Sequence, residues 1–185
     1  LTGCGGGGPT GEPAESAAEL PVPLVLISFD GFRWDYPDRI ETPNFDRVAA
    51  TGFRAERLVP VFPSKTFPGH YSVVTGLYPG HHGIISNNMR DPRWPEVFGL
   101  GRREEVENPR WWGGEPIWVT AARAGLRTAV YFWPGSEAPV QGIQPDWWYP
   151  YDGSVGYEVR VRAALEWLSL PAGERPQLVA LYFEE

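Results

Sequence analysis

The sequence is poor in the residues that build disulfide frameworks and self-contained metal sites. Among its 185 residues it has one cysteine, one methionine and three histidines. One cysteine excludes a disulfide within the chain, and neither paired cysteines nor a His-Glu-x-x-His spacing occurs. No apolar stretch approaches the roughly 20 residues that a membrane-spanning helix needs. The sequence therefore predicts neither a disulfide scaffold nor a zinc site that is complete in itself.

Basic residues are also scarce, and almost all of them are arginine. Of 16 basic residues only Lys65 is a lysine, and the formal net charge is −7. An acidic chain does not suit a nucleic-acid backbone, so we expect no partner of that kind. With 42% hydrophobic and 21% charged residues, the chain can bury a core and form one globular domain or part of a larger one.

The first 20 residues differ in composition from the rest. Leu1-Thr2-Gly3-Cys4 resembles the remnant of a bacterial lipobox, in which the cysteine receives a lipid. Four glycines and a segment rich in Pro, Glu, Ala and Ser follow, which is typical of a flexible tether. We therefore expect residues 1–20 to attach residues 21–185 to a bacterial cell envelope, as a periplasmic or outer-membrane lipoprotein lipidated at Cys4. The plainer interpretation is an unpaired cysteine in a disordered tail.

Beyond residue 20, segments with strand and helix character alternate, which predicts an α/β fold with a mainly parallel sheet between helices. One helix, Tyr157 to Leu170, is expected to bury a face made by Val161, Ala164, Leu165 and Leu168. The expected strands are Leu24–Phe29, Arg127–Phe132 and Gln177–Phe183, and the other expected helices are Pro43–Thr51, Phe67–Thr75 and Pro116–Ala124. Between these elements, Met89 to Glu115 has little periodicity and is expected to be a long surface loop.

This pattern of strands and helices places two oxygen-bearing side chains, those of Asp30 and Thr66, where a catalytic site is expected. Leu24–Phe29 is expected to be a buried parallel strand, and it delivers Asp30 to the carboxyl end, where open α/β sheets bind ligands. Thr66 stands where a proline-bounded loop gives way to a helix, so its hydroxyl is expected near a helix amino terminus. A threonine hydroxyl needs a metal to become a strong nucleophile at neutral pH. Asp30 and Thr66 are therefore candidate ligands of one metal ion.

The histidines do not complete such a site. His70 falls inside the helix after Thr66, while His81 and His82 follow Tyr78-Pro79-Gly80 in an expected turn. We interpret all three as hydrogen-bonded structural residues. Further metal ligands have to come from elsewhere.

Several segments, in order along the chain, resemble the nucleotide pyrophosphatase/phosphodiesterase family of the alkaline phosphatase superfamily. The likeness extends from about Leu24 to Glu185 and identifies the N-terminal part of that family's catalytic domain. The segments that carry it are LISFDGFRWDY, TPNFDRVAATG, FPSKTFPGHYSVVTGLYPGHHGIISNNM, GEPIWVTAARAG, YFWPGSE, YDGSVGYEVRV and LYFEE. The resemblance implies an alkaline-phosphatase-like fold, of which this chain holds an incomplete part.

The resemblance also implies roles for individual residues. In that family two zinc ions flank the nucleophile; Asp30 and Thr66 would bind one of them, and Thr66 would attack phosphorus. Asn87 would contact a phosphate oxygen, although its neighbour Asn88 is an alternative. Substrate-binding residues would be Lys65, near the phosphate or nucleotide, and Phe67 and Tyr151, on the faces of a nucleobase. Gly69 departs from the family's usual asparagine.

The remaining zinc ligands of the family follow the LYFEE segment and are not among these residues, so we expect residues 1–185 alone to be inactive. The resemblance favours a zinc-dependent hydrolase of nucleotide phosphodiester and pyrophosphate bonds that works through a phospho-threonine intermediate. A second hypothesis is another hydrolase of the superfamily, acting on phosphate monoesters, phosphonates or choline lipids. A third is a lipid-anchored binding protein that has lost catalysis, and a structural scaffold is the last.

Overall fold

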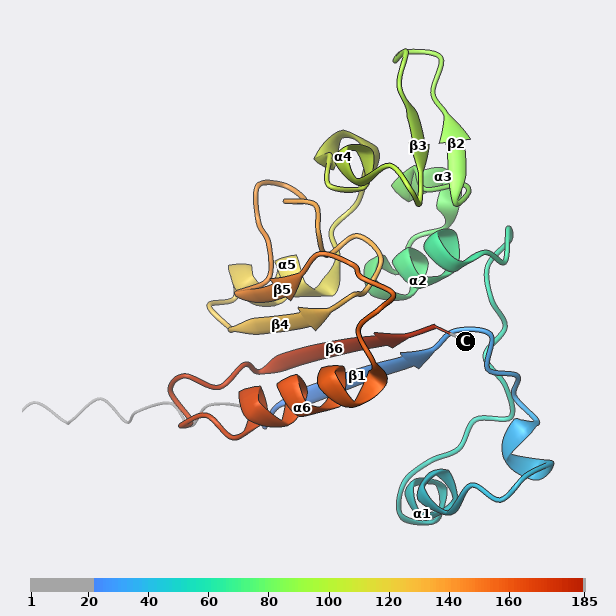
Figure 1. The fold of residues 1–185 in the computed structure, drawn as a ribbon, viewed down its shortest axis with the longest axis vertical. Coiled ribbons are helices and arrows are strands. Elements are labelled where there is room, and N and C mark those ends of the chain that lie inside the picture. Colours follow the sequence, from blue (N-terminus) through green and yellow to red (C-terminus); the bar gives the residue numbers. More distant parts are fainter. Residues whose placement is uncertain (1–21, 185) are drawn as a thin grey trace, which may run out of the picture.

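The computed structural model describes residues 22–184, and they form one parallel sheet with helices on both faces (Figure 1). The strand order is β1, β6, β4, β5, and every neighbouring pair is parallel. The strands are β1 (Leu24–Phe29), β4 (Thr128–Tyr131), β5 (Trp147–Tyr149) and β6 (Leu178–Phe183). The predicted α/β class with a parallel sheet is confirmed. Cys4 and the predicted tether lie outside the described residues, so lipidation stays a prediction.

The expected helices are present, and their ends differ from the prediction by two residues or fewer. They are α1 (Pro43–Thr51), α2 (Thr66–Thr75), α5 (Ile117–Arg123) and α6 (Tyr157–Leu168). No helix among residues 22–184 combines the length and the apolar character needed to cross a bilayer.

The expected surface loop from Met89 to Glu115 is more ordered than predicted. It contains an antiparallel hairpin and a short helix, and the turn before it is also helical. These elements are α3 (Pro79–His82), β2 (Asn88–Arg90), β3 (Val97–Gly99), α4 (Arg103–Val106) and the 3-10 turn Pro109–Trp111. Trp111 and Trp112 of this region are buried and pack against Phe98. The tryptophans therefore hold the segment from Met89 to Glu115 against the domain. Its strands were not predicted because they are too short to show a periodic pattern in the sequence.

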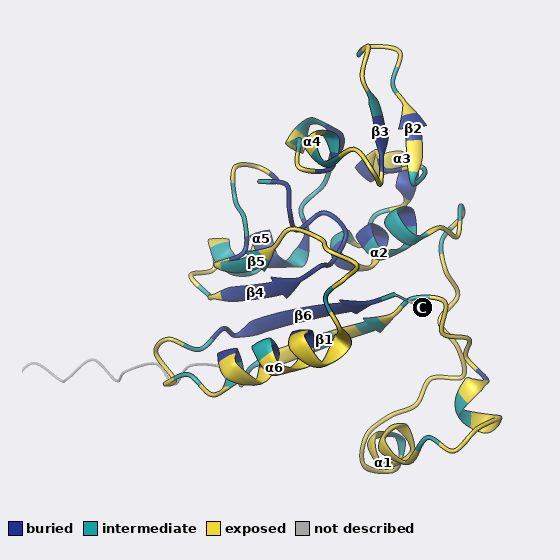
Figure 2. Cartoon of the chain, viewed as in Figure 1, coloured by how far each residue is buried: buried dark blue, intermediate teal, exposed yellow. Residues whose placement is uncertain are grey.

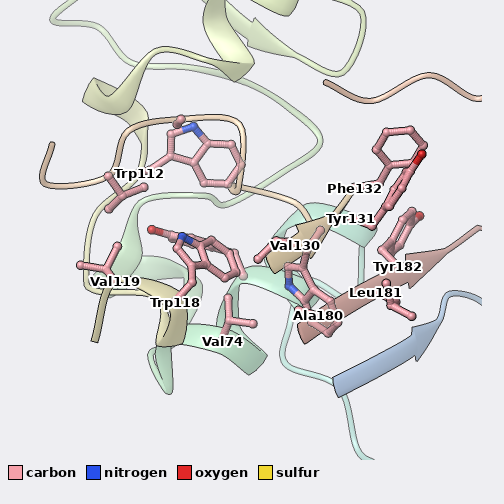
Figure 3. Close-up of a cluster of buried hydrophobic side chains, with 14 of the residues drawn as sticks. Val74, Trp112, Trp118, Val119, Val130, Tyr131, Phe132, Ala180, Leu181 and Tyr182 are labelled. Carbon is pink, nitrogen blue, oxygen red and sulfur yellow. The ribbon is translucent and has the colours of Figure 1, made fainter. Parts of the chain in front are cut away.

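Alternate residues of the central strands face two different helix layers. Val130 and Ala180 lie with Val74 of α2 and Trp118 of α5 on one side of the sheet (Figure 3). On the other side, Tyr131 contacts Trp167 of α6, with 6.0 Å between ring centroids. This alternation follows from the two-residue repeat of a strand, and it makes β4 and β6 the buried centre of the domain.

The expectation that β1 is a buried strand is wrong for the described residues. Figure 2 shows β1 as intermediate to exposed, and Leu24 keeps 56% of its surface. The reason is topological: β1 pairs with β6 on one side, and among residues 22–184 it has no strand on the other. An apolar sequence alone does not distinguish an edge strand from a central one.

The predicted buried face of α6 is correct for Ala164, which is buried, and for Leu168, which packs partly buried against the core, but it is wrong for the other two residues. Val161 and Leu165 are exposed, Leu165 by 59%, whereas Arg160, Ala164 and Trp167 are buried. The helix is turned so that the Arg160 guanidinium faces the end of β6 and pairs with Glu184. A buried arginine with a carboxylate partner overrides the apolar pattern, because the pair provides the charge compensation that burial requires.

Candidate active site

Four of the predicted site residues line one open cleft of about 1220 Å³. Asp30 enters it from the end of β1, and Lys65 and Thr66 enter it from the start of α2. Asn87 enters it from the chain between α3 and β2. The cleft thus lies at the carboxyl end of a parallel strand, the place where open α/β sheets bind ligands.

The Asp30 carboxylate is held by two hydrogen-bond donors. The Gly31 backbone N–H donates to Oδ1 at 3.0 Å, and the Tyr182 hydroxyl donates to Oδ2 at 2.9 Å. Gly31 has φ of +69°, a conformation that glycine adopts without steric cost, and it turns the chain immediately after the strand. Each carboxylate oxygen keeps a lone pair, so Asp30 is a fixed ligand with capacity for a cation.

Thr66 is the first residue of α2, and Lys65 before it is extended and exposed. The helix has ten residues, ends at Thr75 and is capped by Gly76, whose φ is +68°. Thr66 is therefore at the positive end of the helix dipole, where negative charge on an oxygen is favoured by about 0.3 to 1 kcal/mol. This is the environment predicted for it.

Asn87 is oriented by a hydrogen bond from the start of the same helix. The Phe67 backbone N–H donates to Asn87 Oδ1 at 3.0 Å. Because a backbone N–H can only donate, the carbonyl oxygen of the amide must face it, and the Nδ2 amino group faces elsewhere as a donor. Asn87 therefore has the polarity needed to donate to an anionic oxygen in the cleft.

His70 also lines the cleft, and both of its ring nitrogens are engaged. Nε2 lies 2.8 Å from Ser28 Oγ, and Nδ1 lies 2.8 Å from the Thr66 carbonyl oxygen. Burial lowers the pKa of His70, and the opposing influences of the Thr66 carbonyl and the Asp30 charge are smaller. These contacts agree with the interpretation of His70 as a hydrogen-bonded structural residue.

The two predicted nucleobase contacts do not line this cleft. The Phe67 ring is half-buried against Phe98 and Trp112, at centroid distances of 5.9 and 5.8 Å. Tyr151 packs on Phe132 at 5.1 Å and is 41% exposed. Neither ring is among the residues that line the cleft, and nucleobase stacking between the two rings stays a prediction.

The donor set of the cleft fits a metal ion only in part. Asp30 supplies a carboxylate and Thr66 a hydroxyl, both of them oxygen ligands that zinc accepts. Among residues 22–184, no group of three or more His, Cys, Asp or Glu side chains is arranged to hold a metal ion. The described residues thus offer part of a zinc site and need further ligands to complete one.

Sequence reasoning missed three residues that organise this site: Ser28, Trp133 and Tyr182. Ser28 and Tyr182 are opposite one another in the β1–β6 register and lie on the sheet face toward α2. The Trp133 indole N–H donates to the His70 carbonyl oxygen at 3.1 Å. The alternation of each strand was a usable signal for which residues share a face, but the register between the strands was not available from the sequence.

Comparison with known proteins identifies the relatives of this chain. Residues 24–185 match the family model described as type I phosphodiesterase / nucleotide pyrophosphatase. Human ectonucleotide pyrophosphatase/phosphodiesterase family member 1 is 46% identical over 179 residues, which are 94% of this chain and 19% of the relative. Venom phosphodiesterase from Macrovipera lebetinus is 44% identical, over 93% of this chain and 21% of the relative. The chain thus spans about a fifth of the length of these curated relatives.

Solved structures give the same result for the fold. Murine ectonucleotide pyrophosphatase/phosphodiesterase 5 matches with a TM-score of 0.82 and 36% identity, over 88% of this chain and 43% of that one. A form of the same murine protein described as inactive, with a threonine replaced by alanine and in complex with AMP, matches with a TM-score of 0.83 and 35% identity. It covers 89% of this chain and 44% of that one. The predicted alkaline-phosphatase-like α/β fold is confirmed, and the chain belongs to the type I phosphodiesterase / nucleotide pyrophosphatase family.

Proposed function

We propose that the protein containing this chain hydrolyses phosphodiester and pyrophosphate bonds of nucleotides, with Thr66 as the nucleophile. One observation carries the proposal: Asp30, Thr66 and Asn87 line a single cleft, and Asn87 is hydrogen-bonded to the helix that begins at Thr66. The names of the relatives support the reaction class, and the AMP complex of the murine relative supports a nucleotide substrate.

Each residue has a separate task in this reaction. Thr66 Oγ attacks phosphorus, a bond forms between them, and the bond from phosphorus to the leaving alcohol or nucleotide breaks. The resulting phospho-threonine still carries the other ester group of the substrate, and its hydrolysis by water releases a phosphate monoester and restores the hydroxyl. Negative charge gathers on the other phosphorus oxygens during each attack, and the Asn87 Nδ2 group donates to one of them. Lys65, exposed at the edge of the cleft, adds a positive charge for the phosphate.

Asp30 and Thr66 would hold one of the two zinc ions that the family implies, and the remaining ligands would come from outside the described residues. Bound zinc acts as a Lewis acid that favours the deprotonated hydroxyl and counters charge on the phosphate. We propose on the same basis that residues 1–185 alone do not turn over substrate, because two oxygen ligands do not close a zinc site.

The test compares Thr66→Ala with Thr66→Ser in the full-length protein. We expect Ala to abolish hydrolysis of an aryl nucleotide diester and Ser to retain part of it, because only serine keeps an attacking hydroxyl. Thr51→Ala, at the exposed end of α1, is the matched control and should keep wild-type activity. Mass spectrometry of the quenched enzyme should find the nucleoside monophosphate of the substrate attached to Thr66 in the wild type. Full activity of Thr66→Ala would overturn the assignment.

Two alternatives have distinct outcomes in the same assays. A faster reaction with an aryl phosphate monoester than with the nucleotide diester would favour a different hydrolase of the superfamily. Tight nucleotide binding by the zinc-loaded wild type without turnover would favour a binding protein that has lost catalysis.

We propose separately that Cys4 anchors the protein to a bacterial envelope membrane through a lipid. The support is the lipobox-like segment at residues 1–4 and the glycine-rich stretch after it. Mass spectrometry of the full-length precursor expressed in a bacterium should find a diacylglyceryl group on Cys4. An unmodified Cys4 would refute the anchor and leave the proposed catalysis untouched.

A further inference from the structure

The two halves of the proposed active site, the end of β1 and the start of α2, are linked by one histidine. Ser28 lies two residues before Asp30 on β1, and its hydroxyl oxygen is 2.8 Å from His70 Nε2. His70 Nδ1 is 2.8 Å from the carbonyl oxygen of Thr66. A chain of two hydrogen bonds therefore runs from the strand that carries the candidate metal ligand to the residue proposed as nucleophile.

The chemistry of the partners assigns every proton in this bridge. A carbonyl oxygen can only accept, so His70 Nδ1 carries the hydrogen that it donates to Thr66. In the neutral ring Nε2 is then an acceptor, and the Ser28 hydroxyl donates to it. One tautomer and one hydroxyl orientation satisfy both bonds.

The surroundings hold the ring in place from the sheet and from the loop after β4. The Tyr182 ring is 5.0 Å from the imidazole at an interplanar angle of 85°, and the Trp133 ring is 5.4 Å away at 70°. Trp133 also donates its indole N–H to the His70 carbonyl oxygen. Both the side chain and the backbone of His70 are therefore fixed relative to the sheet.

We propose that His70 is a positioning residue, which sets the separation between Asp30 and Thr66 through the bridge from Ser28 to the Thr66 carbonyl. The inference deepens the proposed function and rests on it. As the first residue of α2, Thr66 has an N–H without an acceptor inside the helix, so the helix holds its backbone only through the carbonyl side, and a second bond to that carbonyl adds constraint. Catalysis by a shared metal requires both ligands at a fixed spacing, and displacement of about 1 Å can cost roughly 100-fold in rate.

The two bonds of the bridge can be removed separately. In His70→Gln the side-chain amide can reach Ser28 as Nε2 does, whereas in His70→Asn it can reach the Thr66 carbonyl as Nδ1 does. Ser28→Ala removes the hydroxyl on the strand side. His81→Ala, on the exposed face of α3, and Ser169→Ala, at the exposed end of α6, are the matched controls.

We expect kcat for the nucleotide diester to fall by about 10- to 100-fold in Ser28→Ala and in each His70 variant, as for other residues that orient metal ligands, while KM changes little. Ser28→Ala combined with His70→Asn should be no slower than His70→Asn alone, because both changes remove the same bond. The controls should keep wild-type kcat. If the variants were simply less well folded, activity and thermal stability would fall together, and the double variant would be slower than His70→Asn alone.

Two readouts do not depend on turnover. Zinc titrated into the metal-stripped protein should bind about 10- to 100-fold more weakly to Ser28→Ala and the His70 variants than to the wild type or the controls. Nitrogen-15 NMR of histidine-labelled protein, assigned by the loss of a signal in His70→Gln, should find the hydrogen of His70 on Nδ1. An Nε2–H tautomer, or wild-type kcat and zinc affinity in Ser28→Ala and both His70 variants, would overturn the inference. An inactive wild type would overturn the proposed function instead.

Discussion

The Tyr182 hydroxyl donates a hydrogen bond of 2.9 Å to Asp30 Oδ2, joining two residues that lie 152 positions apart in the chain. The bond exists because Tyr182 pairs with Ser28 in the β1–β6 register, two residues before Asp30. Burial, together with the negative charge of Asp30, raises the pKa of Tyr182, so the hydroxyl stays protonated and acts as a donor. The central strand β6 thus orients a candidate ligand on the edge strand β1.

Tyr182→Phe removes this hydroxyl and keeps the ring that packs on His70. A hydrogen bond to a charged group contributes about 1.5 to 3 kcal/mol, so we expect the free energy of unfolding of the metal-free protein to fall by about 1.5 kcal/mol. Urea denaturation measures this change. Tyr78→Phe, in which the hydroxyl belongs to an exposed side chain, is the control. Equal stabilities for the two variants would show that the bond contributes nothing.

A second prediction concerns the ion pair between α6 and the end of β6. The Arg160 side chain is fully buried, and its two terminal nitrogens each donate to an oxygen of Glu184 at 2.6 Å. This hydrogen bonding lowers the pKa of Glu184. Glu184→Gln leaves a buried guanidinium without its counter-charge, so we expect about 3 kcal/mol of destabilisation in chemical denaturation.

The control for this ion pair is Glu158→Gln, an exposed change in the first turn of the same helix. It should alter the free energy of unfolding by no more than about 0.5 kcal/mol. If Glu184→Gln were as stable as Glu158→Gln, the Arg160 charge would be compensated by the Tyr182 and Val155 carbonyl oxygens alone.

Most helices and strands could be predicted because their signals are local. Pro43 after Thr42 marks the start of α1, and Gly76 in a left-handed conformation marks the end of α2. Asp30, Thr66 and Asn87 could be placed in one site because the family resemblance covered all three segments. The correct predictions of helices, strands and site residues therefore depend on short-range signals and on motifs, and a single sequence contains both.

The errors and omissions share a different cause. The exposure of β1 depends on its position at the edge of the sheet, and the burial of Arg160 depends on Glu184, 24 residues away. The contact of Tyr182 with Asp30 depends on the register of two strands. Periodicity along one segment carries no information on these long-range relationships, so they had to be found in the structure.

A third prediction tests the nucleobase contacts implied by the family. If Phe67 and Tyr151 hold a base, Tyr151→Leu should raise KM for a nucleotide diester by about 5- to 150-fold, in line with about 1 to 3 kcal/mol of stacking per base. The same variant should leave KM for a bis-aryl phosphodiester, which has no base, unchanged. Tyr149→Leu, an exposed tyrosine on β5, is the matched control. An equal effect on both substrates would exclude a base-specific role.

A fourth prediction concerns acid sensitivity at His82, which is buried behind α2. The Ile84 backbone N–H donates to His82 Nδ1 at 3.2 Å, so the hydrogen of the neutral ring must be on Nε2, which faces Ser72 Oγ at 2.9 Å. Burial lowers the pKa of His82 to about 4. In the charged ring Nδ1 would carry a hydrogen that faces the Ile84 N–H, and this repulsion disfavours protonation further.

The sign of the effect on stability follows from these two states. The unfolded chain, with a histidine pKa near 6.5, binds more protons than the folded one between about pH 6.5 and 4. The free energy of unfolding is therefore not reduced by His82 above pH 6.5 and falls as the pH drops below it. At about 1.4 kcal/mol per pKa unit, up to about 3 kcal/mol is lost on acidification to pH 4. His82→Asn keeps an acceptor for Ile84 but does not titrate in this range, so its free energy of unfolding should fall less steeply with acidification than that of the wild type.

His81→Asn, at the exposed neighbouring position, should keep the wild-type slope. Equal slopes for His82→Asn and the wild type in urea denaturation from pH 7 to 4 would show that His82 is not the acid-sensitive group.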